Sequence, residues 1–506
     1  MNPLASAKCA RRVLAALAIM TMISLTAGCG SGSGIVRSLG GGFSNSSLKG
    51  QYVISQTGIG FEQPQVGTGT APFSETIVFT ADGNRNITVT VDDFDQVGGP
   101  FGLTSPEAGT YSIASDGTGS INIGGSNGFN FAITMIDDNH FYIIEQDFFA
   151  TASGFGEKQD TTAFTAAPSG TFVFKAHNVD SSSRVGQMTI TAGAISGTED
   201  LLTPGLLSSS TPIATSVAMS APDATNGFGT FTLTDGSSFR YYVVNSGKFY
   251  IMSNSASGSL EIGQAEAQTG GPFSLATLAA NSSYVFGSSG DTSVPVGIHS
   301  AGVFTSDGNG NITGGAVDYV QDATVNSNLT VSGGTYSLAS NGRGTTNLTL
   351  AGGTISPQIF WMVNGNRAYF LVNSAVAVED GTFSLQQGLP FTALSSQAAF
   401  VMDGFDVTYK DRVGAFTPTS GGFNWNQAAN SFNATTGIGT LTALGTNGTA
   451  QVSSNGRVAV VVNNVTASGA SPGVVFYLSS PNTGFMVQED VFGFDIGGAF
   501  TVQTSP

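Results

Sequence analysis

A fourfold internal repeat constrains the fold of this chain more than any other feature of its sequence. Four segments begin alike: FSNSSLKGQYVI (43–54), FTAAPSGTFVF (164–174), FSLATLAANSSYVF (273–286) and FTALSSQAAFV (391–401). Their leading phenylalanines, Phe43, Phe164, Phe273 and Phe391, are 121, 109 and 118 residues apart. A period of this length matches that of a small domain, so the 506 residues are predicted to contain four modules.

Two further landmarks recur in the same order inside each module. The first is a glycine-rich hairpin signal followed by a strand: SDGTGSINI (115–123), TNGFGTFTL (225–233), SNGRGTTNLTL (340–350) and TTGIGTLTAL (435–444). The second is an aromatic strand: HFYIIE (140–145), KFYIMS (248–253), AYFLVN (368–373) and GFMVQE (484–489). The modules are therefore placed at 43–163, 164–272, 273–390 and 391–506.

The residues within a module predict an all-β fold. Runs such as ETIVFT (75–80), NITVTV (86–91) and FNFAITMI (129–136) are rich in β-branched and aromatic residues, with turn-forming clusters between several of them. No part of the chain beyond residue 28 has a sustained 3.6-residue apolar period. Seven or eight strands per module indicate an antiparallel meander, and closing it into an up-and-down barrel of lipocalin or avidin size removes exposed edges. The alternatives are a β-sandwich per module, or a propeller with two blades per module.

The composition agrees with strands and points to a polar surface with little charge. Charged residues are only 10% of the chain, against about 25% in typical soluble domains. Helix formers such as Glu, Lys and Arg are scarce, and Ser, Thr, Asn and the 69 glycines supply much of the polar surface. With 40% hydrophobic residues the chain can bury real cores, so global disorder is not expected.

The N-terminus is predicted to be a signal peptide, residues 1–28. Three basic residues precede the apolar stretch VLAALAIMTMISLTAG (13–28), which is too short and poorly flanked for a membrane span. The stretch ends in LTAGC, which resembles the lipobox of bacterial lipoproteins and places an acyl anchor on Cys29. The match departs from the usual box because Leu25 lies one place early and Thr26 takes its slot. An ordinary secretory signal with an incidental cysteine is the alternative.

Charge and cysteine content restrict the partners of the mature chain. Cleavage removes Cys9 and three cations, which leaves one thiol, Cys29, and 13 cations against 33 anions, a net charge of −20. This charge argues against nucleic acid and anionic lipid head groups as partners. Residues 29–42, with GSGSG at 30–34, are predicted to be a flexible tether to the membrane. Gly30 after the cysteine favours the outer membrane or cell surface as the location.

Several strings of the repeats resemble those of a known group of proteins. SLKGQYVIS, FTADGNRNIT, GTYSIASDGTG, EKQDTTAF and FTSDGNGNITGG are similar to the repeats of surface lipoproteins that are abundant in soil bacteria. The resemblance covers essentially the whole mature chain, although modules 2 and 4 lack the Asp-Gly-Asn string. That family is uncharacterised, so the resemblance implies β repeats and an envelope location without a catalytic motif to transfer.

The string FTSDGNGNITGG (304–315) has the alternate oxygen side chains of a calcium loop. An EF-hand loop counted from Asp307 needs Gly at its sixth position, where this chain has Ile312, and Asp318 falls at the twelfth. Module 1 has the same departure, with Ile87 and Asp93 counted from Asp82. The residues after each turn read as a returning strand, so a tight hairpin turn is predicted and no metal site is expected.

Nucleophile motifs and histidines give no catalytic constellation. G-x-S-x-G occurs at 124–128 and 469–473, but the strand–turn–helix context that this motif needs is absent from the sequence. His140, His177 and His299 are placed at a turn, a strand end and a loop, with no partner at catalytic or metal-ligand spacing. No cofactor is expected.

Paired acids and aromatic residues are the remaining candidates for a site. The pairs Glu145/Asp147 and Glu489/Asp490 could serve glycoside hydrolysis, but solvated strand ends are the simpler interpretation. Aromatic residues lie at alternating strand positions, for example Tyr142, Tyr250 and Phe370. They are expected to fill barrel or sandwich interiors, and a barrel interior can also hold an apolar ligand. The two indoles, Trp361 and Trp425, lie in different modules and do not form a repeated carbohydrate platform.

Together these observations predict a non-enzymatic, lipid-anchored cell-surface repeat protein that acts as a spacer, adhesin or binding array. Its expected partners are the membrane, through Cys29, and an extracellular glycan, apolar ligand or protein. One alternative is a barrel that binds a small ligand or glycan, which a large apolar cavity open at one end of each module would favour. The other is a glycoside-type hydrolase with acids near Glu145 or Glu489.

Overall fold

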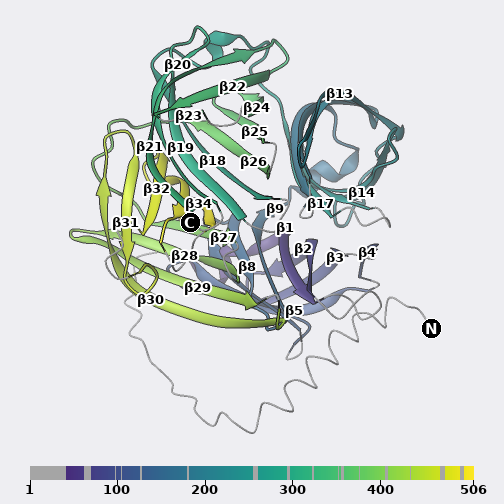
Figure 1. The fold of residues 1–506 in the computed structure, drawn as a ribbon. Helices are drawn as coiled ribbons and strands as arrows, with labels where there is room; N and C mark the ends of the chain where they lie inside the picture. The colour runs from purple at the N-terminus through teal and green to yellow at the C-terminus, as the bar shows by residue number, and fades with distance from the viewer. Residues whose placement is uncertain are drawn as a thin grey trace.

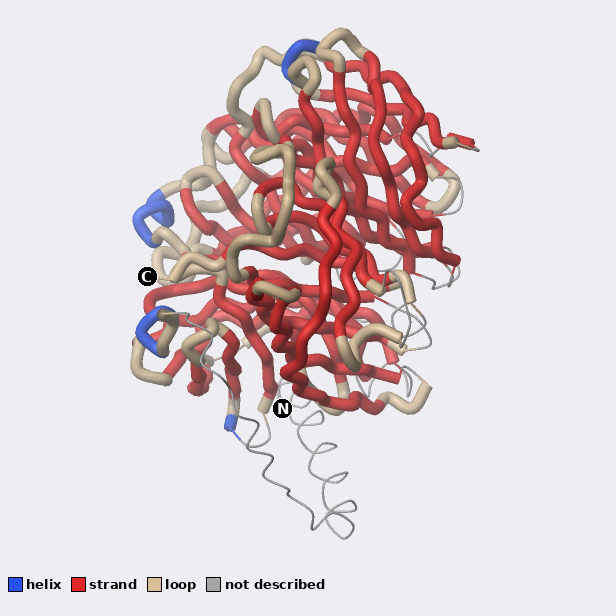
Figure 2. The backbone as a smooth tube through the Cα atoms, turned by 90° about the vertical axis from the view of Figure 1, so that its left-hand side faces the viewer, coloured by secondary structure: helices blue, strands red, loops and turns tan. Residues whose placement is uncertain are grey.

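The computed structural model describes residues 42–505, except for 62–69, 97–98, 104, 126–127, 179–181, 255–259, 293–296, 322–323, 352, 355–357, 375–376, 405–407, 434, 468–472 and 491–494. The predicted signal peptide, Cys29 and nearly all of the predicted tether lie outside the described residues. Strands dominate what is described (Figure 2), together with three 3₁₀ turns: η1 (Asn45–Ser47), η3 (Thr161–Thr165) and η4 (Leu275–Thr277). Within these ranges no helix is long and apolar enough to cross a membrane.

The first module is a closed barrel of eight antiparallel strands, with the short β4 added beside β3. Its strands are β1 (Lys49–Phe61), β2 (Thr70–Asp82), β3 (Asn86–Gln96), β4 (Gly99–Phe101), β5 (Glu107–Ile113), β6 (Thr118–Ile123), β7 (Phe129–Met135), β8 (His140–Glu145) and β9 (Ala150–Lys158). The last strand, β9, closes the barrel by pairing with β1.

The second module repeats this plan without an added strand. Its strands are β10 (Gly170–Asn178), β11 (Ser182–Thr191), β12 (Ala194–Thr203), β13 (Leu206–Val217), β14 (Phe228–Leu233), β15 (Ser238–Asn245), β16 (Lys248–Ser253) and β17 (Glu261–Ala267). Pairing of β17 with β10 closes it.

The third module has eight barrel strands and the two-residue β23 beside β22. Its strands are β18 (Ser282–Thr292), β19 (Gly297–Ser306), β20 (Asn311–Gln321), β21 (Thr324–Leu338), β22 (Arg343–Leu350), β23 (Gly353–Thr354), β24 (Gln358–Asn364), β25 (Arg367–Asn373) and β26 (Ala377–Leu385). Here β26 pairs with β18.

The fourth module is again a closed eight-stranded barrel. Its strands are β27 (Ala398–Gly404), β28 (Tyr409–Thr419), β29 (Gly422–Asn433), β30 (Ile438–Val452), β31 (Arg457–Val462), β32 (Val474–Ser480), β33 (Thr483–Gln488) and β34 (Ile496–Val502). The prediction of four tandem up-and-down barrels is therefore confirmed, and the sandwich and propeller alternatives are excluded.

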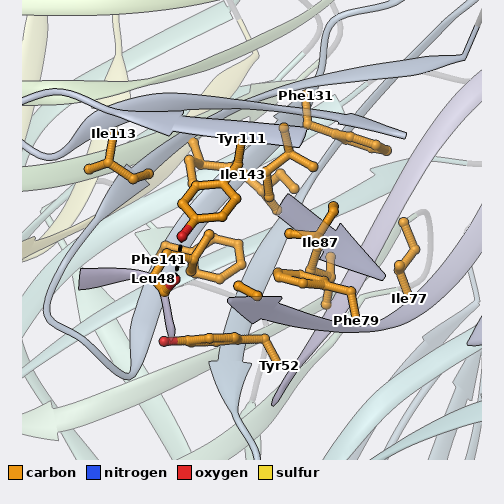
Figure 3. Close-up of a cluster of buried hydrophobic side chains, with 14 of the residues drawn as sticks. Leu48, Tyr52, Ile77, Phe79, Ile87, Tyr111, Ile113, Phe131, Phe141 and Ile143 are labelled. Carbon is orange, nitrogen blue, oxygen red and sulfur yellow. Dashed lines mark hydrogen bonds between the residues drawn. The ribbon is translucent and has the colours of Figure 1, made fainter. Parts of the chain in front are cut away.

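Each barrel has its own apolar core, built by the alternation of inward and outward side chains along its strands. In β14, for example, every second residue is buried, as the two-residue period of a strand requires. Figure 3 shows the core of barrel 1, where the rings of Tyr52 and Phe79 stack with centroids 5.6 Å apart. Offset aromatic pairs of this kind add about 0.5–1.5 kcal/mol to the burial of their area.

The leading phenylalanine of each repeat closes one end of its barrel. Phe43, Phe164, Phe273 and Phe391 are all buried, and each lies against a glycine with positive φ in the hairpin between the fourth and fifth barrel strands. Those glycines are Gly117, Gly227, Gly342 and Gly456. The fourth partner corrects the sequence alignment: the equivalent hairpin in module 4 is at Gly456, whereas TTGIG (435–439) belongs to the preceding hairpin, between β29 and β30.

The four barrels pack side by side in a closed ring (Figure 1), because each contacts the next and the fourth contacts the first. The first two strands of one barrel lie against the last strands of its neighbour: β1 and β2 against β16 and β17, β10 and β11 against β24 and β25, β18 and β19 against β33, and β27 and β28 against β7, β8 and β9. Each interface buries a separate apolar cluster. The ring is therefore held by surfaces that face outward from each barrel.

A glutamine directly after the last strand of each barrel links it to the next barrel. The side-chain amides of Gln159, Gln268, Gln386 and Gln503 donate to main-chain carbonyls of the following barrel, at distances of 2.6, 2.7, 2.7 and 2.6 Å. The fourth bond runs from Gln503 to the carbonyl of Met135 in barrel 1. The C-terminal segment therefore closes the ring.

Replacing Gln503 with alanine is expected to lower the free energy of unfolding by about 1–3 kcal/mol, because the buried Met135 carbonyl loses its donor. Hydrogen exchange should show faster exchange in β7 and β8. The same change at Gln386 is the control: it should cost a similar free energy but leave exchange in β7 and β8 unchanged. Equal exchange patterns in the two variants would contradict this role for Gln503.

Three of the four interfaces also contain a buried aspartate that reaches an arginine and an aromatic donor of the next barrel. Asp200 of barrel 2 is the clearest case: it binds Arg343 through two hydrogen bonds of 2.7 and 2.9 Å and accepts a third, of 2.9 Å, from the Trp361 indole. Asp93 and Asp318 have the same arrangement at the interfaces between barrels 1 and 2 and between barrels 3 and 4. Barrel 4 has Ala428 in this place, so its interface with barrel 1 lacks the buried charge.

Candidate functional site

The third barrel contains a cavity of about 200 Å³ that is partly open to solvent. It is lined by Phe286, Ile298, Ser300, Val317, Tyr319, Gln321, Leu350, Gln358, Val372, Ser374, Ala377 and Glu379. Ile298 and Tyr319 lie toward the strand ends opposite the Asp307 turn, and that turn is next to the end closed by Phe273 and η4. The cavity therefore lies toward the end of the barrel opposite the one closed by Phe273.

Among the described residues that line this cavity, Glu379 is the one that carries a carboxyl group. Glu379 is 7% exposed, and its Oε1 accepts hydrogen bonds from the hydroxyls of Ser288 and Ser300, the second at 3.1 Å. Burial raises the pKa of Glu379, and the two serine hydroxyls act in the opposite direction. Within the described part of the chain no basic side chain pairs with this group.

Barrel 2 has a different arrangement at the same positions. Arg184 on β11 points into the barrel between Glu199 and Glu261, with 3.2 Å from Nη1 to the Glu199 carboxylate and 2.5 Å from Nε to that of Glu261. Burial raises the pKa of both acids, and the arginine opposes this shift. All three side chains are buried inside the matching end of this barrel.

At the same end of barrels 1 and 4, polar side chains of each barrel contact one another. In barrel 4 the guanidinium of Arg412 donates to Gln488, whose amide donates to Asp490 at 3.0 Å. In barrel 1 the amide of Gln56 donates to Glu75 at 2.5 Å. The same barrel position thus carries four different sets of polar side chains, and in barrel 3 it borders a cavity.

A second group of titratable residues lies where all four barrels meet, and we call Lys175, His177, Asp380, Asp403 and Asp411 the axial cluster. Asp380 of barrel 3 accepts from Lys175 at 2.9 Å and lies 3.1 Å from His177, both of barrel 2; these cations hold its pKa well below the usual range against the effect of burial. Asp403 and Asp411 of barrel 4 contact Ser153 and Thr151 of barrel 1. Burial raises the pKa of Asp403 to about 6.

The axial cluster makes stability depend on pH in a predictable direction. Burial, and then the charge of Asp403, raise the pKa of Asp411 to about 8, from 3.8 in the unfolded chain. The folded state therefore holds this proton up to about pH 8, and its contribution to stability falls as pH rises between 3.8 and 8. Asp411→Asn, which cannot ionise, is expected to gain stability relative to wild type as pH rises through this window.

Urea denaturation of both proteins at several pH values measures this difference. Asp307→Asn, at an exposed hairpin of barrel 3, is the control. The pKa of Asp307 is lowered by its hydrogen bonds to Asn311 and Asn309, so this variant should lose stability relative to wild type as pH rises through the acid range. A wild-type to Asp411→Asn difference that is constant between pH 4 and pH 8 would contradict the assignment.

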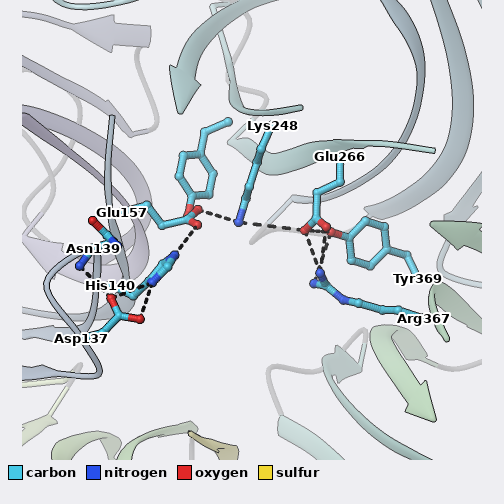
Figure 4. A network of polar contacts seen from close by, with 9 residues as sticks. Asp137, Asn139, His140, Glu157, Lys248, Glu266, Arg367 and Tyr369 are labelled. Atoms are coloured by element: carbon cyan, nitrogen blue, oxygen red, sulfur yellow. Dashed lines mark hydrogen bonds and ion pairs between the residues drawn. The ribbon is translucent and has the colours of Figure 1, made fainter. Parts of the chain in front are cut away.

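A chain of alternating charges joins barrels 1, 2 and 3 (Figure 4). Glu157 of barrel 1 lies 3.5 Å from His140 and 2.5 Å from Lys248 of barrel 2, and Glu266 of barrel 2 lies 2.8 Å from Arg367 of barrel 3. Hydrogen bonds to Asp137, then Glu157, raise the pKa of His140 to about 9. His140 and Lys248 hold the pKa of Glu157 at about 2 despite its burial. Every charged group in this network has an oppositely charged partner, so the network holds barrels 1, 2 and 3 together.

The comparisons with known proteins identify no family for this chain. No protein-family model and no curated protein matches the chain. Among solved structures it is similar to transferrin binding protein B from serogroup B Neisseria meningitidis, with 10% identity over 67% of this chain and 77% of that chain and a TM-score of 0.22. Transferrin binding protein B from Haemophilus parasuis has 7% identity over 66% and 76%, with a TM-score of 0.21. At these scores the likeness carries no argument about ligand, partner or location.

Two of the three histidines contact acidic side chains in the folded chain. His140 begins β8 and contacts Asp137 and Glu157, and His177 in β10 contacts Asp380. His299 lies in β19 and not in a loop; it packs on Gly497 of barrel 4, and burial lowers its pKa to about 4. No group of three or more His, Cys, Asp or Glu among the described residues could hold a metal ion.

The interpretation of the acid pairs as solvated strand ends is wrong. Glu145 is 1% exposed inside barrel 1, and Glu489 and Asp490 are also buried. Asp490 belongs to the polar set inside barrel 4, whereas Glu489 faces barrel 3, where burial and the carboxylate of Asp318 raise its pKa to about 8. These two neighbours, which directly follow β33, therefore point in opposite directions. Asp147 accepts a hydrogen bond from Asn430 at its carbonyl.

The turn prediction is confirmed, and the prediction for the aromatic residues is confirmed in part. The Asp307 carboxylate accepts from the main-chain amides of Asn309 and Asn311, which makes a hairpin turn, and Asp82 does the same in module 1. Phe370 fills a barrel interior and Trp425 does so in barrel 4, as expected for strand aromatics. Tyr142, Tyr250 and Trp361 instead lie between barrels.

Sequence reasoning did not single out Glu379, Ser300 or Arg184. The feature of the sequence that could reveal them is the repeat. When the modules are aligned by their strand pairing, Ser300 pairs with Ser288 as Arg184 pairs with Ala176. Ser300 therefore occupies the arginine position of barrel 2. An alignment of the four modules at the level of strand positions could have found this exchange.

Proposed function

We propose that the protein binds a small organic molecule in the cavity of barrel 3 and catalyses no reaction. The cavity is the observation that carries this proposal. Its volume of about 200 Å³ exceeds that of an apolar protein cavity of about 150 Å³ that binds benzene. Seven of the twelve lining residues are apolar or aromatic and five are polar, so the wall offers both apolar contact and hydrogen-bonding groups, as a small-molecule site requires.

The arrangement of the carboxyl groups favours binding over hydrolysis. A glycosidase needs two carboxyl groups about 5–9.5 Å apart across one cleft. Glu379 is the one acid among the described residues that line the cavity, and the acids considered from the sequence lie elsewhere, inside barrel 1, inside barrel 4 and between barrels 3 and 4. The closed ring also favours a compact binding protein over an extended spacer.

The proposal includes export and attachment to the cell envelope through Cys29. Its support is the sequence of the N-terminal segment, with a basic region, an apolar stretch and the lipobox-like LTAGC. Replacement of Cys29 with serine is expected to move the protein from the membrane fraction to the soluble fraction of cells that express it. A variant that stays in the membrane fraction would contradict the anchor.

Binding can be tested with full-length protein and a panel of monocyclic and short-chain compounds. Some members are expected to raise the melting temperature of wild type. Ala377→Phe, which places a ring in the cavity, should abolish these shifts. Leu275→Phe is the control, because Leu275 is exposed at the closed end of the same barrel and the variant should respond as wild type does. Equal shifts in Ala377→Phe and wild type, or no shift with any compound, would contradict the proposal.

A further inference from the structure

The repeat provides an internal comparison for the cavity of barrel 3. In barrel 2, Arg184 pairs across the strands with Ala176, and Glu261 lies opposite Asn178, two residues further along β10. In barrel 3, Ser300 pairs with Ser288, and Glu379 lies opposite Gly290, again two residues further along. Glu379 is therefore the counterpart of Glu261, and Ser300 is the counterpart of Arg184.

Glu199, which contacts Arg184 in barrel 2 together with Glu261, also has a different counterpart in barrel 3. Glu199 lies opposite Gly186 in barrel 2, and Val317 lies opposite Gly302 at the matching place in barrel 3. Barrel 3 thus keeps one of the two carboxyl groups, replaces the other with an apolar side chain and replaces the guanidinium with a hydroxyl. The space that an arginine fills in barrel 2 is part of a cavity in barrel 3, since Ser300, Val317 and Glu379 all line it.

The polar contacts of Glu379 preserve a binding position for a positive charge. Both serine hydroxyls donate to the same oxygen, Oε1, and so hold the carboxyl group in one orientation in the wall. In barrel 2 the matching carboxylate is neutralised by a cation 2.5 Å away, whereas no described basic side chain pairs with Glu379. A buried carboxylate gains most from a charged hydrogen-bond donor, because hydrogen bonds to charged groups are the strongest.

We infer that the ligand of barrel 3 carries a cationic head, an amine or guanidinium, which binds Glu379 in the place where barrel 2 holds the Arg184 guanidinium. This inference rests on the proposed function. The apolar part of the ligand packs against Phe286, Val317 and Leu350. A ligand with an anionic head is disfavoured, because its charge would repel the buried carboxylate of Glu379.

Three compounds of nearly equal size test this inference by calorimetric titration of the full-length protein: benzylamine, benzyl alcohol and benzoate. Benzylamine is expected to bind at least about tenfold more tightly than benzyl alcohol, the ratio that a charged hydrogen bond supplies. Benzoate should bind more weakly than benzyl alcohol. Glu379→Gln should remove the preference for the amine and leave the binding of benzyl alcohol similar to wild type.

Two further variants complete the experiment. Ser300→Arg should place an internal guanidinium beside Glu379, as in barrel 2, and block all three compounds; its melting curve reports whether it folds. Asp307→Asn is the matched control, because it removes a negative charge from the same barrel at the opposite end and should retain the preference for benzylamine. The Glu379→Gln comparison keeps the test decisive if Ser300→Arg does not fold.

The outcomes separate this inference from the proposed function. Equal binding of benzylamine and benzyl alcohol, or a preference for benzylamine that survives Glu379→Gln, overturns the cationic head while the binding site stands. Binding that is unchanged by Ala377→Phe places these compounds outside the cavity and overturns both. No binding of any of the three compounds to wild type also overturns both.

Discussion

Replacing Asp200 with alanine is expected to lower the free energy of unfolding by about 3–5 kcal/mol, the usual cost of removing one member of a buried ion pair. Asp200 is fully buried and receives hydrogen bonds from Arg343, Trp361, Ser209 and the main chain of Ser210. Without the carboxylate, the guanidinium and the indole N–H lose their acceptor inside the interface between barrels 2 and 3. The melting temperature of the full-length protein measures the loss.

Two companion variants identify the cause. Asp200→Asn keeps the shape and one acceptor for Trp361 but not the charge, so it should fall between wild type and the alanine variant. Asp200→Ala combined with Arg343→Met should recover part of the loss, because the unpaired cation is removed along with its partner. The protein already contains such an apolar version, at Ala428 between barrels 4 and 1. A double variant no more stable than Asp200→Ala would contradict this explanation.

Arg184→Ala is expected to lower the free energy of unfolding by a similar amount, about 3–5 kcal/mol near pH 8. It leaves the buried carboxyl groups of Glu199 and Glu261 without their cation. Burial already raises the pKa of both acids, so without the arginine they take up protons more readily in the folded state. The folded variant then binds more protons than the unfolded chain, and its stability falls as pH rises above the 4.5 of a free glutamate.

Chemical rescue tests the same position. Millimolar methylguanidinium chloride is expected to raise the melting temperature of Arg184→Ala, because it can occupy the vacated space between the two acids, whereas sodium chloride should not. Wild type is the control, because Arg184 already fills this space in it and any binding of methylguanidinium beside Glu379 of barrel 3 is common to both proteins, so the shift should be larger for Arg184→Ala. A rescue that sodium chloride reproduces would point to screening and contradict specific occupancy.

Local sequence was sufficient to predict most strands, because short runs of β-branched and aromatic residues between turn-forming clusters indicate a strand without knowledge of its partners. The aromatic strand of each repeat is an example. The segments HFYIIE, KFYIMS, AYFLVN and GFMVQE form β8, β16, β25 and β33, the seventh barrel strand of each module. Turn residues were equally informative, since the side chain of Asp307 satisfies the amides of its own hairpin. Both signals arise within a few residues along the chain.

The strand that closes barrel 1 was harder to recognise, because its residues are chosen by long-range contacts. ATASGFGEK (150–158) has poor strand propensity, yet it forms β9 and pairs with β1, about a hundred residues earlier. Gly156 is required by a ring of the neighbouring strand: a Cβ there would lie 2.1 Å from a ring atom of Phe141. The mistaken hairpin at 435–439 has a similar origin, since several glycine-rich turns in module 4 look alike until the pairing with Phe391 is known.

The sequence by itself determined the number of modules, their all-β character and the Asp-Gly-Asn turns, because the repeat is visible by self-comparison and because strand preference and turn chemistry are local properties; it left barrel, sandwich and propeller open for each module. Only the tertiary structure decided the ring, the partners of the buried charges and the cavity of barrel 3. These depend on which outward faces meet and on which inward side chains share one barrel end. Residues such as Ser300 and Glu379 are 79 positions apart in the chain and become neighbours only when the barrel closes.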